Sequence, residues 1–233
     1  DTLLHIHLAE TRDEAAELEA ANGGTRTTQL LADAGVFDGQ VLAAHGVWLD
    51  ADDLATLTGA GVAVAHCPVS NMKLGSGVAP ITAMQRAGIT VALGTDGPAS
   101  NDTLDLWEEV KITPLLARVA ANDPLALSAA DALTMATRDG AAALGMPDVG
   151  HLSPGARADI IRVDPDHLAF SPITHQTELL AHLVWAGASR HISDVWVEGR
   201  QVVDNGACVT VDVDRARDEV QRRAERLARE SGT

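Results

Sequence analysis

Cysteine is scarce in this chain, and its scarcity excludes two classes of small protein. The 233 residues contain only Cys67 and Cys208, which lie far apart and in unlike contexts. A disulfide framework needs several paired cysteines, and a cysteine-rich zinc module needs them in closely spaced groups. The fold must therefore depend on a hydrophobic core, and a chain of this length can bury a sizeable one.

Basic residues and long apolar runs are also few. Lysine and arginine number 17 against 33 aspartates and glutamates, and the formal net charge is −16 at pH 7. This balance argues against nucleic acid or an anionic membrane surface as a partner. No apolar run approaches the ~18–20 residues of a transmembrane helix. The first residues show neither the basic start nor the apolar centre of a signal peptide. We therefore expect a soluble, cytoplasmic protein.

What the chain does have is a repeated pattern, in which a short apolar run leads to a histidine or an aspartate. Four runs share it: residues 1–8, 41–44, 62–65 and 90–95. They deliver His7, with Glu10 three residues later, and then His45, His66 and Asp96. One such histidine is as readily a core residue as a ligand, but four runs of this kind are hard to explain by core residues. Histidine and carboxylate side chains at strand ends can serve as metal ligands and proton carriers.

Helix-like sequence separates the four runs, at residues 11–21, 27–34, 50–57 and 80–87. Thr11 and Asp50 are expected to cap the helices that begin there. This alternation predicts βα units and a parallel sheet. In barrels built from such units, the chemistry lies at the carboxyl ends of the strands, where all four polar residues fall. Residues 69–77 follow neither period, and we expect a loop beside the substrate. Longer helices are expected over residues 103–120 and 128–144.

The pattern changes at Gly150. Alternating strands over residues 155–163 and 194–203, with a helix over 179–185 between them, predict a small, mainly β domain. A charged helix is expected over residues 214–230. We therefore divide the chain into residues 1–149, 150–211 and 212–233. We interpret the remaining histidines as structural or surface residues: His151, His167, His175, His182 and His191.

Several motifs, in this order, resemble those of the amidohydrolase superfamily. They are His7-Leu8-Ala9-Glu10-Thr11, Ala44-His45-Gly46, His66-Cys67-Pro68 with Ser70-Asn71-Met72-Lys73-Leu74, and Gly94-Thr95-Asp96-Gly97 with Ala99-Ser100-Asn101. Within the superfamily they look most like the branch of S-adenosylhomocysteine and methylthioadenosine deaminases, which also holds the triazine (atrazine) chlorohydrolases. Residues 155–159 similarly resemble the return of the chain into that family's β-sandwich. The resemblance covers nearly the whole chain and is more specific for the superfamily than for the substrate.

This resemblance implies an α/β fold: the C-terminal half of a TIM-type (β/α)8 barrel, strands 5 to 8, followed by part of a small β-sandwich. His7 matches the metal ligand of strand 5, and Glu10 matches the glutamate that shuttles protons and contacts the substrate. His45 matches the histidine beside the metal-bound water, and Asp96 the aspartate that binds metal and acts as base. One divalent ion is implied, zinc or alternatively iron. The substrate implied is a small heterocycle, and the residues interpreted as lining its pocket are His66, Asn71 and Asn101.

The chain supplies only half of that fold. A complete barrel needs eight strands and roughly 250 residues, whereas about 150 precede the β domain here. The family's His-x-His ligand pair is absent, and His5-Ile6-His7 is not that pair, because only three strands follow before the β domain. A catalytic zinc takes about three protein ligands, and the chain offers His7, Asp96 and at most His45 as a third. Alone, it is expected to bind zinc weakly or not at all. The expected partners are the N-terminal half of the barrel, in the same protein or a second chain, and further copies in a homo-oligomer.

Three interpretations of function remain open at this point. The first is a metal-dependent aminohydrolase of a purine nucleoside or related N-heterocycle, in which an activated water attacks a ring carbon. The second is another hydrolase of the superfamily, such as a guanine or 8-oxoguanine deaminase or an s-triazine chlorohydrolase. The third is a half-barrel without catalysis, in a binding or structural role. The motifs do not separate loss of an amine from loss of chloride, because the same residues suffice for both.

Overall fold

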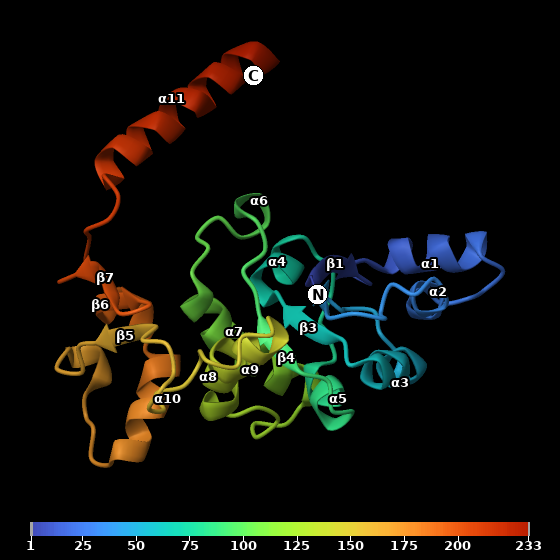
Figure 1. Cartoon of the computed structure of the whole chain (residues 1–233), viewed down its shortest axis with the longest axis horizontal. Coiled ribbons are helices and arrows are strands. Elements are labelled where there is room, and N and C mark those ends of the chain that lie inside the picture. Colours follow the sequence, from blue (N-terminus) through green and yellow to red (C-terminus); the bar gives the residue numbers. More distant parts are fainter. Residues whose placement is uncertain (1, 233) are drawn as a thin grey trace.

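Two β-sheets organise the protein, a parallel sheet in its first part and an antiparallel sheet in its last third (Figure 1). The computed structural model describes residues 2–232, apart from the side chains of residues 176, 177 and 188. Within this described part, no helix combines the length and the apolar composition that crossing a membrane requires.

The first sheet consists of four parallel strands in sequence order. They are β1 (Leu4–Leu8), β2 (Val41–His45), β3 (Ala63–His66) and β4 (Val91–Leu93). The helices between them are α1 (Arg12–Ala21), α2 (Thr27–Asp33), α3 (Ala51–Ala60), α4 (Pro68–Lys73) and α5 (Ile81–Arg86). Parallel pairing sets His7 beside Ala44 and His66 beside Leu93. The predicted parallel sheet with its polar residues at one edge is therefore confirmed.

Side-chain caps fix where several helices begin. Thr11 accepts a hydrogen bond from the backbone N–H of Glu14 at the start of α1. Asp50 accepts from the N–H groups of Asp52 and Asp53 in α3, and the Asp53 carboxylate accepts from the Asp50 N–H in return. Such caps satisfy N–H groups that have no partner within the helix. The caps predicted at Thr11 and Asp50 are confirmed.

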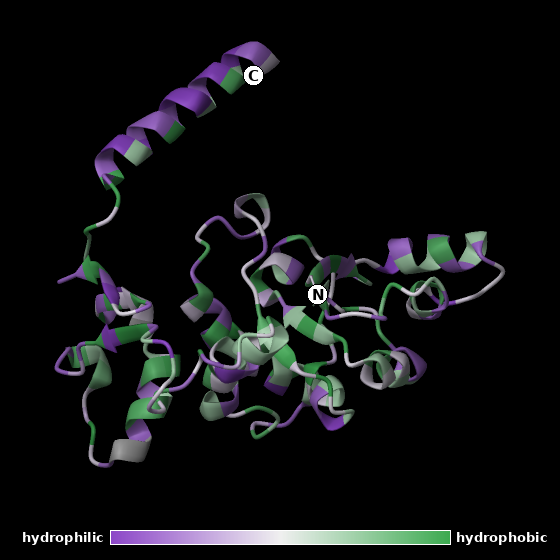
Figure 2. Cartoon of the chain, in the orientation of Figure 1, coloured by the Kyte–Doolittle hydropathy of each residue, from purple (hydrophilic) through white to green (hydrophobic). Residues whose placement is uncertain are grey.

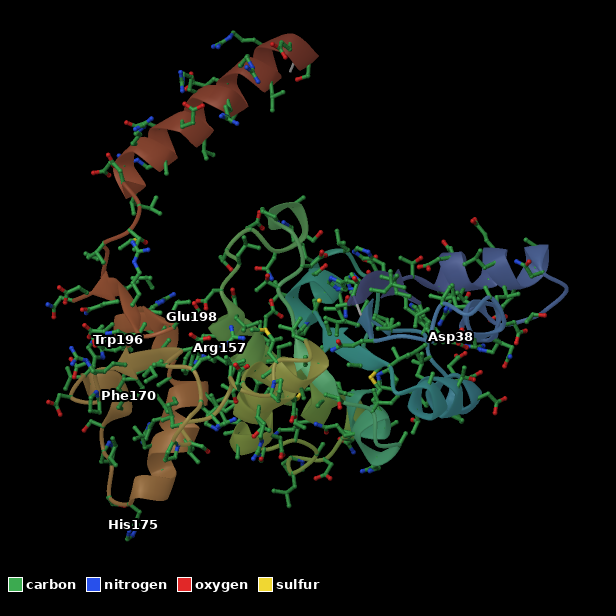
Figure 3. All side chains as sticks on the ribbon, viewed as in Figure 1. Asp38, Arg157, Phe170, His175, Trp196 and Glu198 are labelled. Carbon is green, nitrogen blue, oxygen red and sulfur yellow. The ribbon has the colours of Figure 1, made fainter. Side chains whose placement is uncertain are left out.

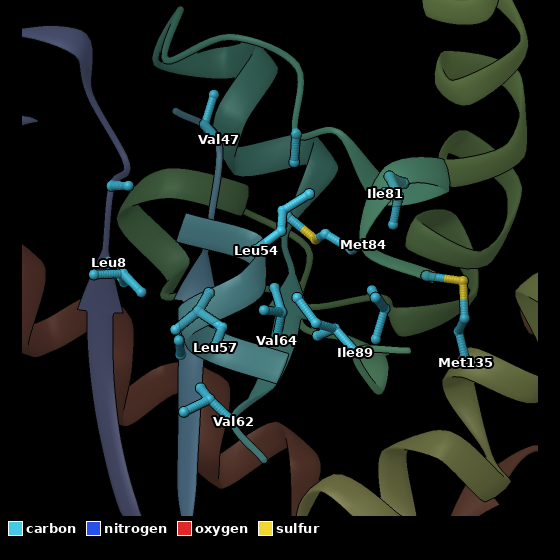
Figure 4. Packing of buried hydrophobic residues seen from close by; sticks show 14 of the residues in the cluster. Leu8, Val47, Leu54, Leu57, Val62, Val64, Ile81, Met84, Ile89 and Met135 are labelled. Carbon is cyan, nitrogen blue, oxygen red and sulfur yellow. The ribbon is translucent and has the colours of Figure 1, made fainter. Parts of the chain in front are cut away.

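The two faces of the parallel sheet have different neighbours. Val64 and its register partner Val91 pack against α3 and α5, where Leu57 and Met84 are 0% exposed (Figure 4). A fully buried leucine of this kind contributes about 1.5–3 kcal/mol. The opposite face carries Leu42 and the small side chains of Ala63, Ala65 and Ala92. Because successive strand residues point to opposite faces, the His7 side chain shares this second face.

Four helices follow β4: α6 (Pro98–Asn101), α7 (Leu106–Ala121), α8 (Ala129–Ala136) and α9 (Arg138–Ala143). The prediction of a single helix over residues 128–144 is wrong, because the helix is interrupted at Thr137. That residue has φ −123° and ψ −92°, and its hydroxyl donates to the carbonyl of Leu133 at 2.6 Å. Threonine hydroxyls that bond back to the preceding turn compete with regular helix geometry.

The loop predicted over residues 69–77 is also wrong in its first half, where α4 forms. Six residues are too few to show a helical period in the sequence. The cap of α4 comes from elsewhere, since the backbone N–H of Val69 donates to the carboxylate of Glu109 in α7 at 3.1 Å. The sequence around residue 69 gives no local indication of a hydrogen-bond partner forty residues away.

The second sheet is antiparallel, with strands β5 (Ile160–Val163), β6 (Ile192–Val197), β7 (Arg200–Asp204) and β8 (Ala207–Cys208). Helix α10 (Gln176–Trp185) lies between β5 and β6 in the chain, flanked by 3-10 turns at Leu168–Phe170 and Ala188–His191. The indole N–H of Trp107 in α7 donates to the carbonyl of Leu183 at 2.7 Å and so ties α10 to the first part of the chain. Arg157 pairs with Glu198 at 3.1 Å, and both are labelled in Figure 3.

The last helix, α11 (Val213–Ser231), projects away from both sheets (Figure 1). Its surface is mostly hydrophilic, with scattered apolar positions (Figure 2). The predicted terminal helix is confirmed. The division into residues 1–149, 150–211 and 212–233 stays a prediction.

A buried carboxylate fastens the segment between α1 and α2 to α3. Asp53 is 2% exposed and accepts hydrogen bonds from Arg26 Nε at 2.9 Å, from the Thr28 hydroxyl and from the Asp50 N–H at 2.9 Å. Burial by itself would raise the pKa of Asp53, but these hydrogen bonds outweigh burial and hold the pKa below its usual value. The contact thus stabilises the fold above the ordinary aspartate pKa and is lost as the pH falls through the lower folded pKa.

We expect Asp53→Asn to lower the free energy of unfolding by about 1–3 kcal/mol, because an amide cannot serve all three donors. The Arg26 side chain is 32% exposed, so water replaces part of the lost contact. Asp52→Asn is the matched control, since Asp52 lies in the same first turn but is exposed. Chemical denaturation at pH 7, followed by circular dichroism, measures both variants. Equal losses would show that the helix dipole carries the effect rather than the buried contact.

Candidate active site

Three metal-binding side chains meet at the carboxyl edge of the parallel sheet. His7 comes from β1, His45 from the end of β2, and Asp96 from the turn after β4, and one ligand atom of each lies within 4.8 Å of the others. The imidazole rings of His7 and His45 stack, with their centroids 5.1 Å apart. Two imidazoles and a carboxylate form a donor set that suits zinc. Within the described part of the chain, the buried His45 Nε2 has no hydrogen-bond partner, so its lone pair is available to an ion or to a water bound beside one.

A left-handed backbone conformation brings His45 into this group. Ala44 shares a face with His7 through the strand register. In a regular strand, the next side chain would therefore point toward the helices. His45 instead has φ 73°, and Gly46 continues with φ 59°. Glycine adopts this conformation without steric cost, and a Cβ at position 46 would in addition lie 3.0 Å from the Met84 methyl.

The ends of β1 and β4 use the same device. Ala9 has φ 49° and Asp96 has φ 63°. A residue other than glycine costs roughly 1–2 kcal/mol in this region, and such outliers tend to gather at functional sites. Backbone hydrogen bonds hold the turns in place: Gly46 donates to the Leu8 carbonyl and Val47 to the Ala9 carbonyl, both at 3.0 Å.

Glu10 and Asn71 lie on opposite sides of the His45 ring. A carboxylate oxygen of Glu10 lies 3.8 Å from His45 Nε2, and the Glu10 side chain is 22% exposed. On the other side, His45 Nδ1 donates to the Asn71 side-chain oxygen at 2.9 Å. That bond places the proton of a neutral His45 on Nδ1 and leaves Nε2 with its lone pair toward the cluster.

Asp96 is held as a carboxylate. Burial by itself would raise its pKa, but hydrogen bonds from the Ser70 hydroxyl, the Gly97 N–H and the Ser100 side chain, together with His45, lower the pKa below its usual value. The Ser70 hydroxyl donates to Asp96 Oδ2 at 2.7 Å. An ionised Asp96 can therefore bind a cation or accept a proton.

His66 and Cys67 lie outside the three-donor group. His66 is fully buried, and burial, with a smaller effect of His45, lowers its pKa to about 3, which leaves a neutral imidazole. Its register partner Leu93 packs against the main core, so His66 belongs to the face opposite His7. Burial raises the pKa of the Cys67 thiol to about 12, and the thiol therefore stays protonated. The predicted contact of His66 with a substrate stays a prediction.

Two further polar residues of the site were not recognised in the sequence. One is Glu109, and the other is Ser70 in its role as hydrogen-bond partner of Asp96. Glu109 is 0% exposed and accepts hydrogen bonds from the Val69 N–H and the Asn101 side chain. A carboxylate on the buried stripe of a helix was the signal that could have revealed it. Asn71 and Asn101 both bond to protein groups, and their predicted contacts with a substrate stay predictions.

Comparison with known proteins places this geometry in context. Residues 1–202 match the model of the amidohydrolase family. The chain is 47% identical over 224 residues to a 5-methylthioadenosine/S-adenosylhomocysteine deaminase of Pelotomaculum thermopropionicum, an alignment that covers 96% of this chain and 51% of the relative. The chain thus spans about half the length of this relative.

Solved structures give the same picture. A zinc-bound adenosine deaminase of Xanthomonas campestris superposes with a TM-score of 0.91 at 35% identity, over 97% of this chain and 51% of that protein. A zinc-bound atrazine chlorohydrolase of Arthrobacter aurescens TC1 superposes with a TM-score of 0.86 at 34% identity, over 95% of this chain and 48% of that protein.

The donor group predicts how single substitutions change metal binding. In a protein completed by an N-terminal half of the barrel, His7→Ala should weaken zinc binding by at least about 100-fold, beyond the 10–100-fold typical of residues that only support a ligand. His5→Ala is the matched control, because His5 lies two residues earlier on the same strand face and is exposed. Competition with a chromophoric chelator measures both affinities. Equal effects of the two substitutions would remove His7 from the site.

Glu109 predicts a pH dependence of stability. Burial, reinforced by the charges of Glu108 and Asp105, raises the pKa of Glu109 to about 7. The folded protein then keeps a proton that the unfolded chain releases near pH 4.5, so the stabilisation is full below pH 4.5 and is lost as the pH rises to about 7.

The difference in unfolding free energy between the wild-type protein and Glu109→Gln should therefore fall by something on the order of 3 kcal/mol across that range. Urea titrations at several pH values measure this difference, in which the contributions of other groups cancel. Glu108→Gln, an exposed neighbour, should show no such trend. A difference that is constant with pH would contradict the raised pKa.

Proposed function

This chain belongs to the amidohydrolase family, and on that premise we propose that it is the carboxyl-terminal part of a metal-dependent aminohydrolase of purine nucleosides. Its substrate class would include 5-methylthioadenosine, S-adenosylhomocysteine and adenosine. The observation that carries the proposal is the group of His7, His45 and Asp96, with Glu10 3.8 Å from His45, at the carboxyl edge of a parallel sheet. The similarity to a deaminase of that name supports the substrate class.

The four parallel strands are proposed to be strands 5 to 8 of a TIM-type barrel, and the antiparallel sheet to be part of a β-sandwich. β1 and β4 are the edges of the parallel sheet, so each leaves one side unpaired within it. His5 and His7 are exposed on β1. An N-terminal half, in the same protein or a second chain, would pair these edges and cover the site. Unpaired edges otherwise favour aggregation.

Each side chain has a proposed task. A divalent ion held by His7 and Asp96, with zinc first and iron second, would supply an activated water. His45 Nε2 would accept a hydrogen bond from that water and orient it toward the ring carbon. Asp96 would receive the proton that the water loses on attack and pass it to the departing amine. Glu10 would protonate the neighbouring ring nitrogen, so that negative charge does not build up on the ring. It would regain a proton from the new hydroxyl group as the amine leaves as ammonia.

An s-triazine chlorohydrolase is the second candidate, favoured by the structural similarity to the atrazine chlorohydrolase. Chloride leaves without a proton, so the same four side chains would suffice. Ammonia and chloride assays on nucleosides and chlorinated triazines separate the two candidates.

Glu10 and Asp96 should respond differently to substitution by their amides. In the chain fused to the half of the Pelotomaculum deaminase that it does not match, Glu10→Gln should keep zinc but lower kcat by ~10²-fold or more, the usual scale for a positioned acid–base group. Asp96→Asn should lose zinc affinity and activity together, because Asp96 is assigned both tasks. Ammonia release from adenosine, methylthioadenosine and S-adenosylhomocysteine is the measurement.

Glu14→Gln is the control for Glu10, because Glu14 also lies near the start of α1 but outside the metal group. It should leave turnover unchanged. Near-wild-type deamination by the Glu10 variant would reduce Glu10 to a residue at a helix start, worth at most ~1 kcal/mol of stability.

A further inference from the structure

Helix α4 depends on another helix for its cap. Among the described residues, Cys67 at its N-cap position makes no side-chain cap. The Val69 N–H, in the first turn of α4, instead donates to the Glu109 carboxylate of α7 at 3.1 Å. Since the first N–H groups of a helix lack partners inside it, Glu109 fixes where α4 begins.

The next two residues of α4 hold the metal group. The Ser70 hydroxyl donates to Asp96 Oδ2 at 2.7 Å, and the Asn71 side-chain oxygen accepts from His45 Nδ1 at 2.9 Å. Both Ser70 and Asn71 are 0% exposed. A displacement of the α4 start would therefore move two supports of the site together.

A second branch starts from the same carboxyl group. Asn101 Nδ2 donates to Glu109 Oε1 at 2.6 Å and also to the carbonyl of Thr95 at 2.8 Å. Thr95 directly precedes Asp96. Glu109 thus acts on Asp96 from two sides, through Ser70 in α4 and through Asn101 and the turn after β4.

The chemistry of this junction requires a carboxyl group. Two donors arrive from different elements, and a carboxylate offers one oxygen to each. A glutamine of the same size has a single acceptor oxygen, and its NH₂ group would face one of the two donors. One of the bonds must then break, and a buried donor is left unpaired.

We propose that Glu109 is a positioning residue of the active site, which sets the geometry of Asp96 and His45 through α4 and Asn101 without contacting the substrate. This inference rests on the proposed function. It adds a residue that lies outside the metal group and outside the motifs recognised in the sequence.

The test compares Glu109→Gln with Glu108→Gln in the complete fused protein. Glu108→Gln makes the same side-chain change in the same turn, but Glu108 is exposed and, among the described residues, its carboxylate bonds to Thr103 rather than to α4 or Asn101. We expect Glu109→Gln to weaken zinc binding by about 10-fold or more, the range known for residues that orient metal ligands. We also expect a lower kcat with little change in KM, and wild-type values for Glu108→Gln. Unchanged zinc affinity with only a lower unfolding temperature would overturn the proposal, because Glu109 would then be purely structural.

Asn101→Ala provides a second, independent readout that stands even if Glu109→Gln fails to fold. It should weaken zinc binding in the same direction. The double variant should lose less affinity than the two single losses combined, because both substitutions interrupt one path. Strictly additive losses, or an Asn101→Ala protein with wild-type affinity, would overturn the proposal.

Failure of the proposed function has a different signature. A wild-type protein that binds zinc tightly but deaminates none of the nucleosides would refute the assigned activity. The shift in zinc affinity on Glu109→Gln would in that case still report on positioning.

Discussion

Parallel pairing of four strands is the constraint on which the rest of the structure depends. It brings every carboxyl end to the same edge of the sheet, so residues from positions 7, 45 and 96 of the chain meet although long stretches of sequence separate them. The strand register also fixes which side chains point to each face of the sheet. A slip of one residue in β1 would turn His7 toward the core around Leu57 and bring Leu8 to the open face.

Strand register alone does not complete the site. The left-handed turns that follow the strands are also needed, and they carry an energetic cost. Left-handed turns at Ala9, His45 and Asp96 cost roughly 1–2 kcal/mol each, which together rivals the burial of one or two leucines. Hydrogen bonds between the strand-end turns and the junction at Glu109 offset this cost. Apolar packing shapes the sheet, whereas buried polar contacts shape the site.

The sequence predicts the parts of this protein that follow local periods. Four apolar runs, the helices between them and the caps at Thr11 and Asp50 were all recognisable, and so were the polar residues at the strand ends. The orientation of the His45 side chain was not recognisable. Strand alternation assigns it to the opposite face, and no sequence pattern indicates a left-handed backbone conformation at a histidine. Helix α4 and the role of Glu109 were not predicted from the sequence for a different reason. Their contact joins residues forty positions apart, and neither side carries a local signal of the other.

Exposure of one side of the site to solvent limits how strongly these residues can bind a metal ion. His45 is fully buried and Asp96 half-buried, but His7 lies exposed on an edge strand. Water beside His7 weakens the attraction between a cation and Asp96, because charges interact far less strongly at high dielectric. Covering that edge would therefore strengthen metal binding even before a further ligand is added. The proposed N-terminal half thus has two separable contributions, new ligands and the exclusion of water, and the second acts through residues that this chain already holds in place.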